Sequence, residues 1–425
     1  MAGVLLFLGT VTQSPAQFVW DAADYWAGAA SLASGGDPFS QHGMSVRGVW
    51  SAVLYLPAAL AARVFGASTA AVAVLVENSL LISVVGVLLL PLLLRAWGPV
   101  TPRMVWVCTG LTWVVVGRFA PYPLTDVWAA ALILAAVLAL QRRPAMSLLG
   151  AGLLAGIAFN VRPAYLVPVL LVLVVVILRR RLAGGLFVVG VVLAQVPQSL
   201  VNLMHGVGWK PWPPGMVGLT QLQAYYASYV VRYDTGAANV PGLAPRQIFC
   251  DPAMAVAIGD HPPDSAGSQV LFYLHNLPQS LVFLAEKAAA VLHWPPSAPY
   301  FAPTWAGEQV IALLVTTVAV MGVASLVYTG FRSGIRSAPL AIWAALLVWL
   351  GSLATILLSA PETRFAMPLV LLGIAGCAAL AGRWPGNRRV ASAAIAIVVV
   401  FAIGTAGLSH PAAPGEVSPA ACEVS

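Results

Sequence analysis

Charged side chains are scarce in this sequence: Asp, Glu, Lys and Arg together make up only 8% of its 425 residues. A soluble domain carries about a quarter charged residues, so this chain lacks the side chains that would solvate a fully water-exposed surface. Hydrophobic residues make up 60% of the sequence, and its mean hydropathy is +0.89. The composition excludes a protein that is soluble over its full length and predicts one that lies in a membrane.

The sequence also lacks the alternating ten-residue segments that a transmembrane β-barrel requires. It contains instead apolar runs of roughly 15 to 22 residues, the length that crosses a hydrocarbon core about 30 Å thick. The first run has no basic segment and no clear cleavage site, which favours a membrane helix over a signal peptide. We therefore expect an all-α polytopic protein of the cell membrane with about 11 transmembrane helices, near residues 1–18, 72–94, 104–117, 121–140, 148–161, 163–178, 184–202, 307–328, 338–358, 365–382 and 391–409.

Cysteine is rare as well, and none of the four cysteines has the spacing of a metal-binding motif. Cys108 and Cys377 lie in apolar runs, so we expect them in the core. Cys250 and Cys422 could form a disulfide if both face an oxidising compartment.

The few charges are distributed unevenly along the chain. Twelve of the 21 basic residues fall on one side of the predicted membrane, in loops that contain no acid: Arg95, Arg103, Arg142, Arg143, residues 179–181, Arg332, Arg336, Arg383, Arg388 and Arg389. All 14 acidic residues and all six histidines fall in the other loops or near the opposite face. Because cytoplasmic loops carry the excess of Lys and Arg, the acid–base side chains are predicted to be extracytoplasmic. The same clustering accounts for the net charge of +7, so we expect no nucleic acid partner.

Two of the predicted extracytoplasmic segments are long, 19–71 and 203–306, and we expect a single integral membrane domain over 1–425. The second segment is rich in Pro, Gly, Trp and Tyr, and contains amphipathic stretches at 221–233 and 277–294. Such stretches predict a folded loop that lies on the membrane surface. The tail 410–425 is small and polar and is predicted to be disordered.

The first outer loop carries the most informative motif. It reads Asp21-Ala-Ala-Asp24-Tyr25, continues through small residues and reaches Gly-Gly-Asp-Pro-Phe at 35–39. This pattern, D-x-x-x-Y followed by G-x-x-P-[YF], resembles the first outer loop of the GT-C superfamily of integral membrane glycosyltransferases. Similar motifs follow in order: APYPLTDVWAAAL with the acid Asp126, a Gly-rich segment ending in Arg162 and Pro163, VPQSLVNLMHGVGW, and PETRFAMPLV with Arg364.

The resemblance implies a GT-C-like fold and a reaction. Members of this superfamily take a sugar from a polyprenyl-phosphate carrier, and the sequence is similar to bacterial mannosyl-, arabinosyl- and aminoarabinosyltransferases. The acceptor would be a glycan, a glycolipid, a protein or a natural product, and the polyprenyl tail would rest among apolar helices and membrane lipid. The frequent Asp-Glu pair of the family is Asp21-Ala22 here, which leaves the subfamily open.

The chemistry of the residues agrees with that expectation. A hydroxyl that attacks a lipid-phosphate sugar needs one base, and a carboxylate can accept its proton. We expect Asp21 to be the base, with Asp24 as a supporting acid, and a direct attack of this kind inverts the anomeric centre. Arg162 and Arg364 are predicted to hold the leaving phosphate, because guanidinium groups bind phosphate with two parallel hydrogen bonds.

The remaining predicted site residues are Tyr25, Asp126 and Glu362, which would help to place the substrates. Only one phosphate leaves, so no metal cofactor is expected, although some branches of the family use one. A cluster at Asp251, Asp260, His261 and Asp264 has no metal-binding spacing and indicates a solvated loop.

Each assignment has an alternative. Asp21 or Asp126 could cap a helix, and Asp24 could be the base. Arg162 and Arg364 could be anchors at the membrane surface, Glu362 could serve only to pair with Arg364, and Glu77 could pair with Arg63. Rival functions are a lipid-linked sugar transporter or flippase, a non-catalytic assembly partner, and an O-antigen ligase or polymerase that uses a pyrophosphate-linked donor together with His205, His275 or His293.

Overall fold

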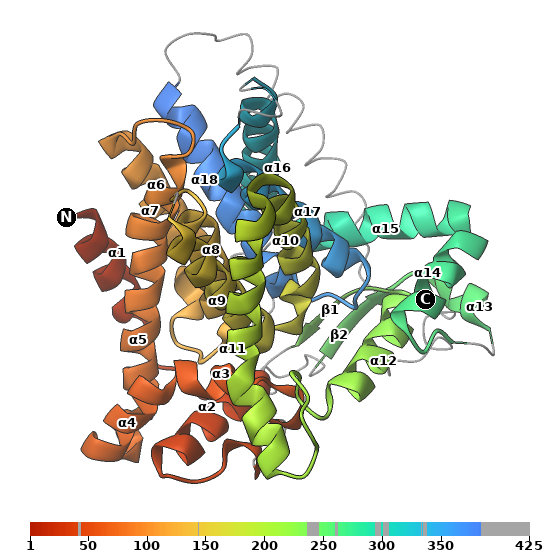
Figure 1. Cartoon of the computed structure of the whole chain (residues 1–425), viewed down its shortest axis with the longest axis horizontal. Helices are drawn as coiled ribbons and strands as arrows, with labels where there is room; N and C mark the ends of the chain where they lie inside the picture. Colours follow the sequence, from red (N-terminus) through yellow and green to blue (C-terminus); the bar gives the residue numbers. More distant parts are fainter. Residues whose placement is uncertain are drawn as a thin grey trace. The chain divides into compact units, whose positions relative to one another are not determined.

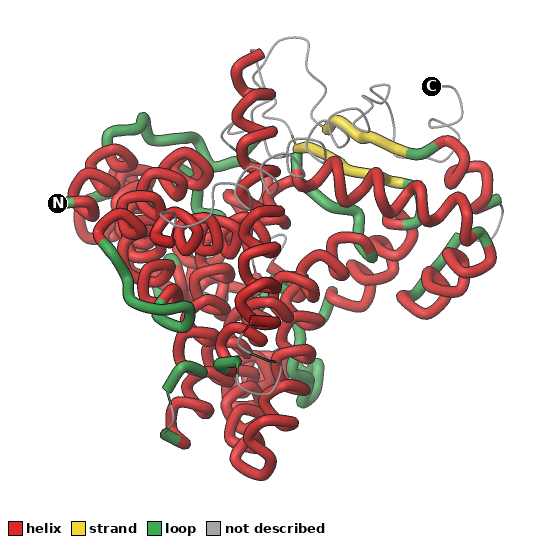
Figure 2. Tube along the Cα trace, turned by 90° about the horizontal axis from the view of Figure 1, so that it is seen from above, coloured by secondary structure: helices red, strands yellow, loops and turns green. Residues whose placement is uncertain are grey.

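The computed structural model describes residues 1–40, 44–142, 144–235, 246–259, 262–293, 299–300, 306–332, 334 and 338–383. These residues are mostly helical, as expected, but one two-stranded antiparallel sheet corrects the prediction of an all-α fold (Figures 1 and 2). The chain divides into two compact units. Unit 1 comprises Met1–Met216, Met321–Gly351 and Leu371–Gly386, and unit 2 comprises Val217–Val320, Ser352–Val370 and Asn387–Ser425.

Ten of the predicted apolar segments coincide with helices of the structure. They are α1 (Ala2–Val11), α5 (Ala70–Val84) continued by a π-helical turn (Val85–Leu89) into α6 (Leu90–Leu94), α7 (Pro102–Val116), α8 (Thr125–Ala139), α9 (Ala145–Val161), α10 (Leu166–Arg180), α11 (Gly185–Met204), α16 (Ala306–Arg332), α17 (Leu340–Leu357) and α18 (Met367–Arg383). The eleventh segment, 391–409, and the tail 410–425 lie outside the described residues.

Four helical stretches of the described chain are long and apolar enough to cross a membrane: Ala67–Leu94, Val310–Tyr328, Leu340–Leu357 and Thr363–Gly382. Others are apolar but shorter, among them Ala2–Val11, Thr125–Ala139 and Ala145–Val161. The helices thus support a membrane protein, and the count of about 11 spans remains a prediction.

The predicted turns between helices are also present. Between α7 and α8 the chain turns through Gly117–Phe119 and the residues up to Leu124. Helix α9 ends at Val161, and Arg162 is extended, with φ −140° and ψ 107°. This conformation is the one that Pro163 imposes on the residue before it, because its ring disfavours helical geometry there.

The segment 19–71 folds into helices in unit 1 (Figure 1). They are α2 (Trp20–Ala33), α3 (Val49–Leu54) and α4 (Leu56–Phe65), with short 3-10 turns at Pro38–Ser40, Met44–Val46 and Ala67–Thr69. Small residues of α2, Ala22, Gly28 and Ala29, are buried. They allow α2 to pack closely against the helices that follow it.

Helices α9 and α11 are in backbone contact through glycine. A Cβ atom at Gly152 would lie 2.0 Å from the carbonyl oxygen of Phe187, and one at Gly190 would lie 2.2 Å from that of Leu149. At Gly156 an added Cβ would lie 2.6 Å from the Cβ of Ala194. Small residues at a four-residue spacing let membrane helices approach closely, which explains the glycine-rich sequence of α9.

Unit 2 contains the large outer segment from Val217 onward. Its elements are α12 (Met216–Ala227), β1 (Val230–Thr235), β2 (Arg246–Cys250), α13 (Pro252–Ile258), α14 (Ala266–His275) and α15 (Leu277–Leu292). The stretch 221–233 therefore divides into a helix and a strand. Tyr229, Ile248, Met254, Tyr273 and Phe283 form its buried core, so this loop is folded, as predicted.

The cysteines agree with the expectation where they are described. Cys108 is buried and Cys377 is partly buried, and neither of these two thiols is in a disulfide. Cys250 is disulfide-bonded, whereas Cys422 lies outside the described residues.

The glycine contacts predict a contrast within one helix. Gly152→Ala inserts a methyl group into the backbone of α11 and should destabilise unit 1 by about 1–3 kcal/mol, the usual cost of overpacking. Gly150→Ala is the matched control, because nothing lies within 4 Å of its added Cβ. It should leave stability unchanged or raise it by up to about 1 kcal/mol through helix propensity. Thermal unfolding in detergent measures both, and equal melting temperatures would contradict the packing.

Candidate active site

Helix α2 presents Asp21 and Tyr25 on one face, because residues four apart are neighbours on a helix. Asp21 lies in the first turn, where the helix dipole favours a carboxylate. The N-cap residue is Val19, so the alternative that Asp21 caps this helix is wrong. Asp24 lies on the same helix and is partly exposed.

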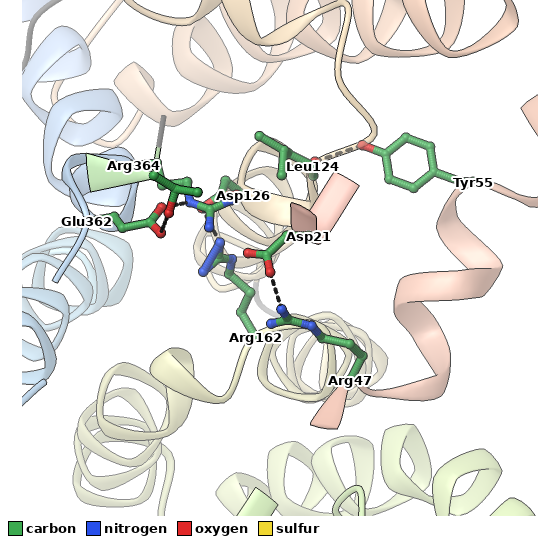
Figure 3. A network of polar contacts seen from close by, with 9 residues as sticks. Asp21, Arg47, Tyr55, Leu124, Asp126, Arg162, Glu362 and Arg364 are labelled. Carbon is green, nitrogen blue, oxygen red and sulfur yellow. Dashed lines mark hydrogen bonds and ion pairs between the residues drawn. The ribbon is translucent and has the colours of Figure 1, made fainter. Parts of the chain in front are cut away.

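Arg47 contacts both residues of the D-x-x-x-Y motif. Its guanidinium forms an ion pair with the Asp21 carboxylate (Figure 3). The same group lies over the Tyr25 ring, 5.1 Å from the ring centroid. Tyr25 is buried, whereas 24% of the Asp21 side chain and 21% of the Arg47 side chain are exposed. Arg47 is not among the residues predicted from the sequence; the available signal was a basic residue in the same predicted outer loop as Asp21 and Asp24.

The position of Arg47 is fixed by the residues that follow it. Gly48 packs so closely on α9 that an added Cβ would lie 2.0 Å from the carbonyl oxygen of Asn160. The N–H groups of Val49 and Trp50 donate to Gln198 Oε1 (2.9 Å) and Asn160 Oδ1 (3.3 Å). Side chains of α9 and α11 thus satisfy the orphan amides at the start of α3.

These two amide side chains belong to a longer buried chain of hydrogen bonds. Asn160 Nδ2 donates to Gln195 Oε1 (3.1 Å), and Gln195 Nε2 donates to the carbonyl oxygen of Gly156 (2.8 Å). Gln198 Nε2 donates to Asn202 Oδ1 (3.1 Å). Asn202 Nδ2 binds the carbonyl oxygens of residues 210 and 212. A buried network whose polar groups are all hydrogen-bonded is rigid. The N-terminus of α3 is therefore held firmly in place.

Asp126 and Arg162 form a second ion pair in the same unit. Asp126 lies in the first turn of α8 with 2% of its side chain exposed, and its Oδ1 is 2.6 Å from Arg162 Nη2. The N-cap residue of α8 is Leu124, so Asp126 does not cap the helix. Arg162 is 11% exposed, which corrects the alternative that it is an anchor at the membrane surface.

The turn before Asp126 is held by a tyrosine of the first outer segment. Tyr55 Oη donates to the carbonyl oxygen of Leu124 (2.7 Å), and Asn78 Nδ2 donates to those of Ala120 (3.1 Å) and Tyr122 (2.7 Å). Burial and the nearby Glu77 carboxylate raise the pKa of Tyr55 well above its ordinary value. Tyr55 therefore stays protonated and keeps donating.

Glu77 and Arg63 do not contact each other as the sequence suggested. Glu77 Oε2 accepts the N–H of Ala58 (2.9 Å) in the first turn of α4. Arg63 instead donates to the carbonyl oxygen of Ala33 at the end of α2. Both side chains thus form hydrogen bonds with the backbone of helices in the first outer segment.

Unit 2 contains the third pair, Glu362 and Arg364. Arg364 Nε donates to Glu362 Oε2, Glu362 Oε1 accepts from Thr235 Oγ1 (2.8 Å), and both charged side chains are 8% exposed (Figure 3). The Arg364 guanidinium lies 5.8 Å from the centroid of the Tyr300 ring. The pairing weighed for Glu362 is therefore present, and the hydrogen bond from Thr235 to Glu362 joins β1 to the turn before α18.

Other predicted polar groups are placed as loop residues. Asp251 caps α13 by accepting the N–H of Met254 (3.0 Å), and Asp264 accepts from Ser268 Oγ (3.1 Å). Asp260 and His261 lie outside the described residues. Among the described side chains, no three His, Cys, Asp or Glu residues gather as metal ligands. His205 Nε2 lies 3.3 Å from Asp37 Oδ2 at an exposed position.

No protein-family model and no curated protein matches the chain. Among solved structures, it is similar to archaeal oligosaccharyltransferase AglB from Archaeoglobus fulgidus, solved with an inhibitory peptide and a dolichol-phosphate. The TM-score is 0.47 and the identity 14%, over 98% of this chain and 56% of that one. This chain thus spans about half the length of that protein, and a likeness at this level establishes neither fold family nor activity.

The burial of the two unit 1 pairs predicts different stability effects. Asp126→Asn leaves the Arg162 charge buried without its counter-ion and should lower the unfolding free energy by about 3–5 kcal/mol. Asp21→Asn breaks a partly exposed pair and should cost no more than about 1 kcal/mol. Thermal or denaturant unfolding of the two variants in the same detergent measures the difference. If Asp21→Asn is the more damaging change, the ranking of the two pairs is wrong.

Proposed function

We propose that this chain is an integral membrane glycosyltransferase of the GT-C type. It transfers one sugar from a polyprenyl-phosphate donor to an acceptor on the extracytoplasmic side, with inversion at the anomeric carbon. Asp21 is the general base. Two observations support this assignment: the resemblance of the sequence motifs and the geometry around Asp21.

The observation that carries the proposal is the partial exposure of Asp21. Among the acids of the predicted site, Asp126 and Glu362 are almost fully buried, with 2% and 8% of their side chains exposed. Asp21 is 24% exposed and is held in place by Arg47, and Asp24 is partly exposed as well. A general base must reach the proton that it removes, which favours Asp21 over the two buried acids, and the D-x-x-x-Y spacing favours it over Asp24.

The reaction requires little covalent chemistry from the protein. The acceptor hydroxyl attacks the anomeric carbon, its proton passes to an Asp21 carboxylate oxygen, and the bond to the phosphate oxygen breaks as the lipid phosphate leaves. A free aspartate is a weak base, with a pKa of about 3.9. Most of its benefit therefore comes from orientation, which the contact with Arg47 provides.

Arg162 is proposed to bind the departing phosphate, because a guanidinium presents five N–H donors in a fixed fork that suits phosphate. Its ion pair with Asp126 joins Nη2 to one carboxylate oxygen. Asp126 then sets the orientation of Arg162. Tyr25 supports Arg47, and Asp24 is proposed to contact the acceptor. The roles of Arg364 and Glu362 in unit 2 remain predictions from the sequence motif.

Sugar transfer by substituted proteins tests the proposed base. Purified protein in lipid vesicles is supplied with polyprenyl-phosphate sugars and candidate glycan, glycolipid and peptide acceptors. Asp21→Asn should lower the initial rate by about 10²–10⁴, the contribution of general base catalysis. Asp24→Asn is the matched control on the same helix and should lower it far less.

The outcomes separate the possible assignments. Equal rates for wild type and Asp21→Asn would show that Asp21 is not the base. Loss of transfer in Asp24→Asn alone would move the role by three residues. Analysis of the product anomer checks inversion independently, because retention would require a carboxylate nucleophile.

A further inference from the structure

Helices α14 and α15 form an elbow with an exposed apolar face. The exposed side chains on it are large and aliphatic, with 41–60% of each accessible: Val270, Leu271, Leu274, Leu277, Leu281 and Val282. Of the described residues between 270 and 282, His275 and Gln279 are the exposed polar ones. A patch of this kind on a folded surface marks an interaction site.

The opposite face of the elbow packs on the core of unit 2. Tyr273 of α14 and Phe283 of α15 are buried there, and Tyr273 Oη donates to the carbonyl oxygen of Ala227 (2.7 Å). Buried and exposed residues thus alternate with helical periodicity in both helices. The exposed leucines belong to well-packed helices, because the other face of each is buried.

Lys287 ties α15 to the end of a candidate membrane span. The side chain is fully buried, and its Nζ donates to the carbonyl oxygens of Ala227 (2.8 Å) and Leu357 (3.1 Å). Leu357 is the last residue of the span Leu340–Leu357, and Ala227 ends α12. The carbonyl groups at a helix C-terminus attract cations, which compensates in part for a burial that lowers the pKa of Lys287.

The other end of α15 contacts a second candidate span. Thr316 Oγ1 donates to the carbonyl oxygen of Leu292, the last residue of α15, at 2.6 Å. Thr316 lies six residues inside the span Val310–Tyr328, which corresponds to about 9 Å along the helix axis. The end of α15 is therefore held inside that apolar segment, close to its Val310 end.

We infer that the apolar face of α14 and α15 lies in the lipid at the outer boundary of the membrane. The observations that carry this inference are the two hydrogen bonds that tie α15 to membrane spans and the row of exposed aliphatic side chains on the same elbow. A helix with one apolar face that lies in the membrane interface buries that face among the headgroups and upper acyl chains. The inference does not depend on the proposed sugar transfer.

Spin labels on the elbow test the inference in the full chain. Leu274→Cys and Leu281→Cys are labelled with a nitroxide in a background without the thiols Cys108 and Cys377, and reconstituted into phospholipid vesicles. Gln279→Cys on the edge of the same face is the matched control, and the labelled background gives the baseline. Power saturation compares collisions with oxygen, which concentrates in lipid, and with a water-soluble nickel chelate.

In lipid, the labels at 274 and 281 should collide with oxygen several-fold more than with the nickel chelate, and the label at 279 should show a lower ratio. Strong nickel collisions at 274 and 281 would show an open aqueous face and overturn the inference. Spin–spin broadening with little access to either reagent would assign the face to a second copy of the chain, and would overturn it as well. Val282→Cys replaces any variant whose melting temperature falls.

Discussion

The first outer segment of unit 1 depends on one close contact, in which Gly48 packs against the carbonyl oxygen of Asn160. No side chain larger than hydrogen fits at position 48. The contact lets Asn160 and Gln198 accept the first N–H groups of α3. Arg47, next to the glycine, is thereby placed against Asp21 and Tyr25. The geometry of the candidate base thus rests on helix packing in α9 and α11, far from it in sequence.

Burial separates the charged residues by their physical role. The Asp126–Arg162 and Glu362–Arg364 pairs are almost fully buried; the first joins α8 to the residue that follows α9, and the second lies within one turn. The cost of desolvating such ions is large, so each partner depends on the other. Asp21 and Arg47 keep contact with solvent, which leaves their charges available to a substrate. Lys287 in unit 2 is also buried and also has partners, but these are the carbonyl oxygens of two helices and not an acidic side chain.

The sequence predicts the helices well, because apolar runs and Pro163 act locally. It also groups Asp21 with Tyr25, since a spacing of four fixes a helix face. It does not predict that Arg47 is the partner of Asp21, because the two are 26 residues apart and no periodicity relates them. The Glu77–Arg63 pairing fails for a related reason: a helix N-terminus and a carbonyl oxygen are partners that charge counting overlooks.

The central claim is that Asp21 and Arg47 act as one unit in sugar transfer. A double-mutant cycle of the transfer rate with Asp21→Asn, Arg47→Gln and both changes tests it most directly. If Arg47 works by orienting Asp21, Arg47→Gln should slow the wild-type reaction clearly and have almost no further effect once Asp21 is replaced, because residues that act as a unit are not additive. Equal and independent losses from the two substitutions would contradict the account.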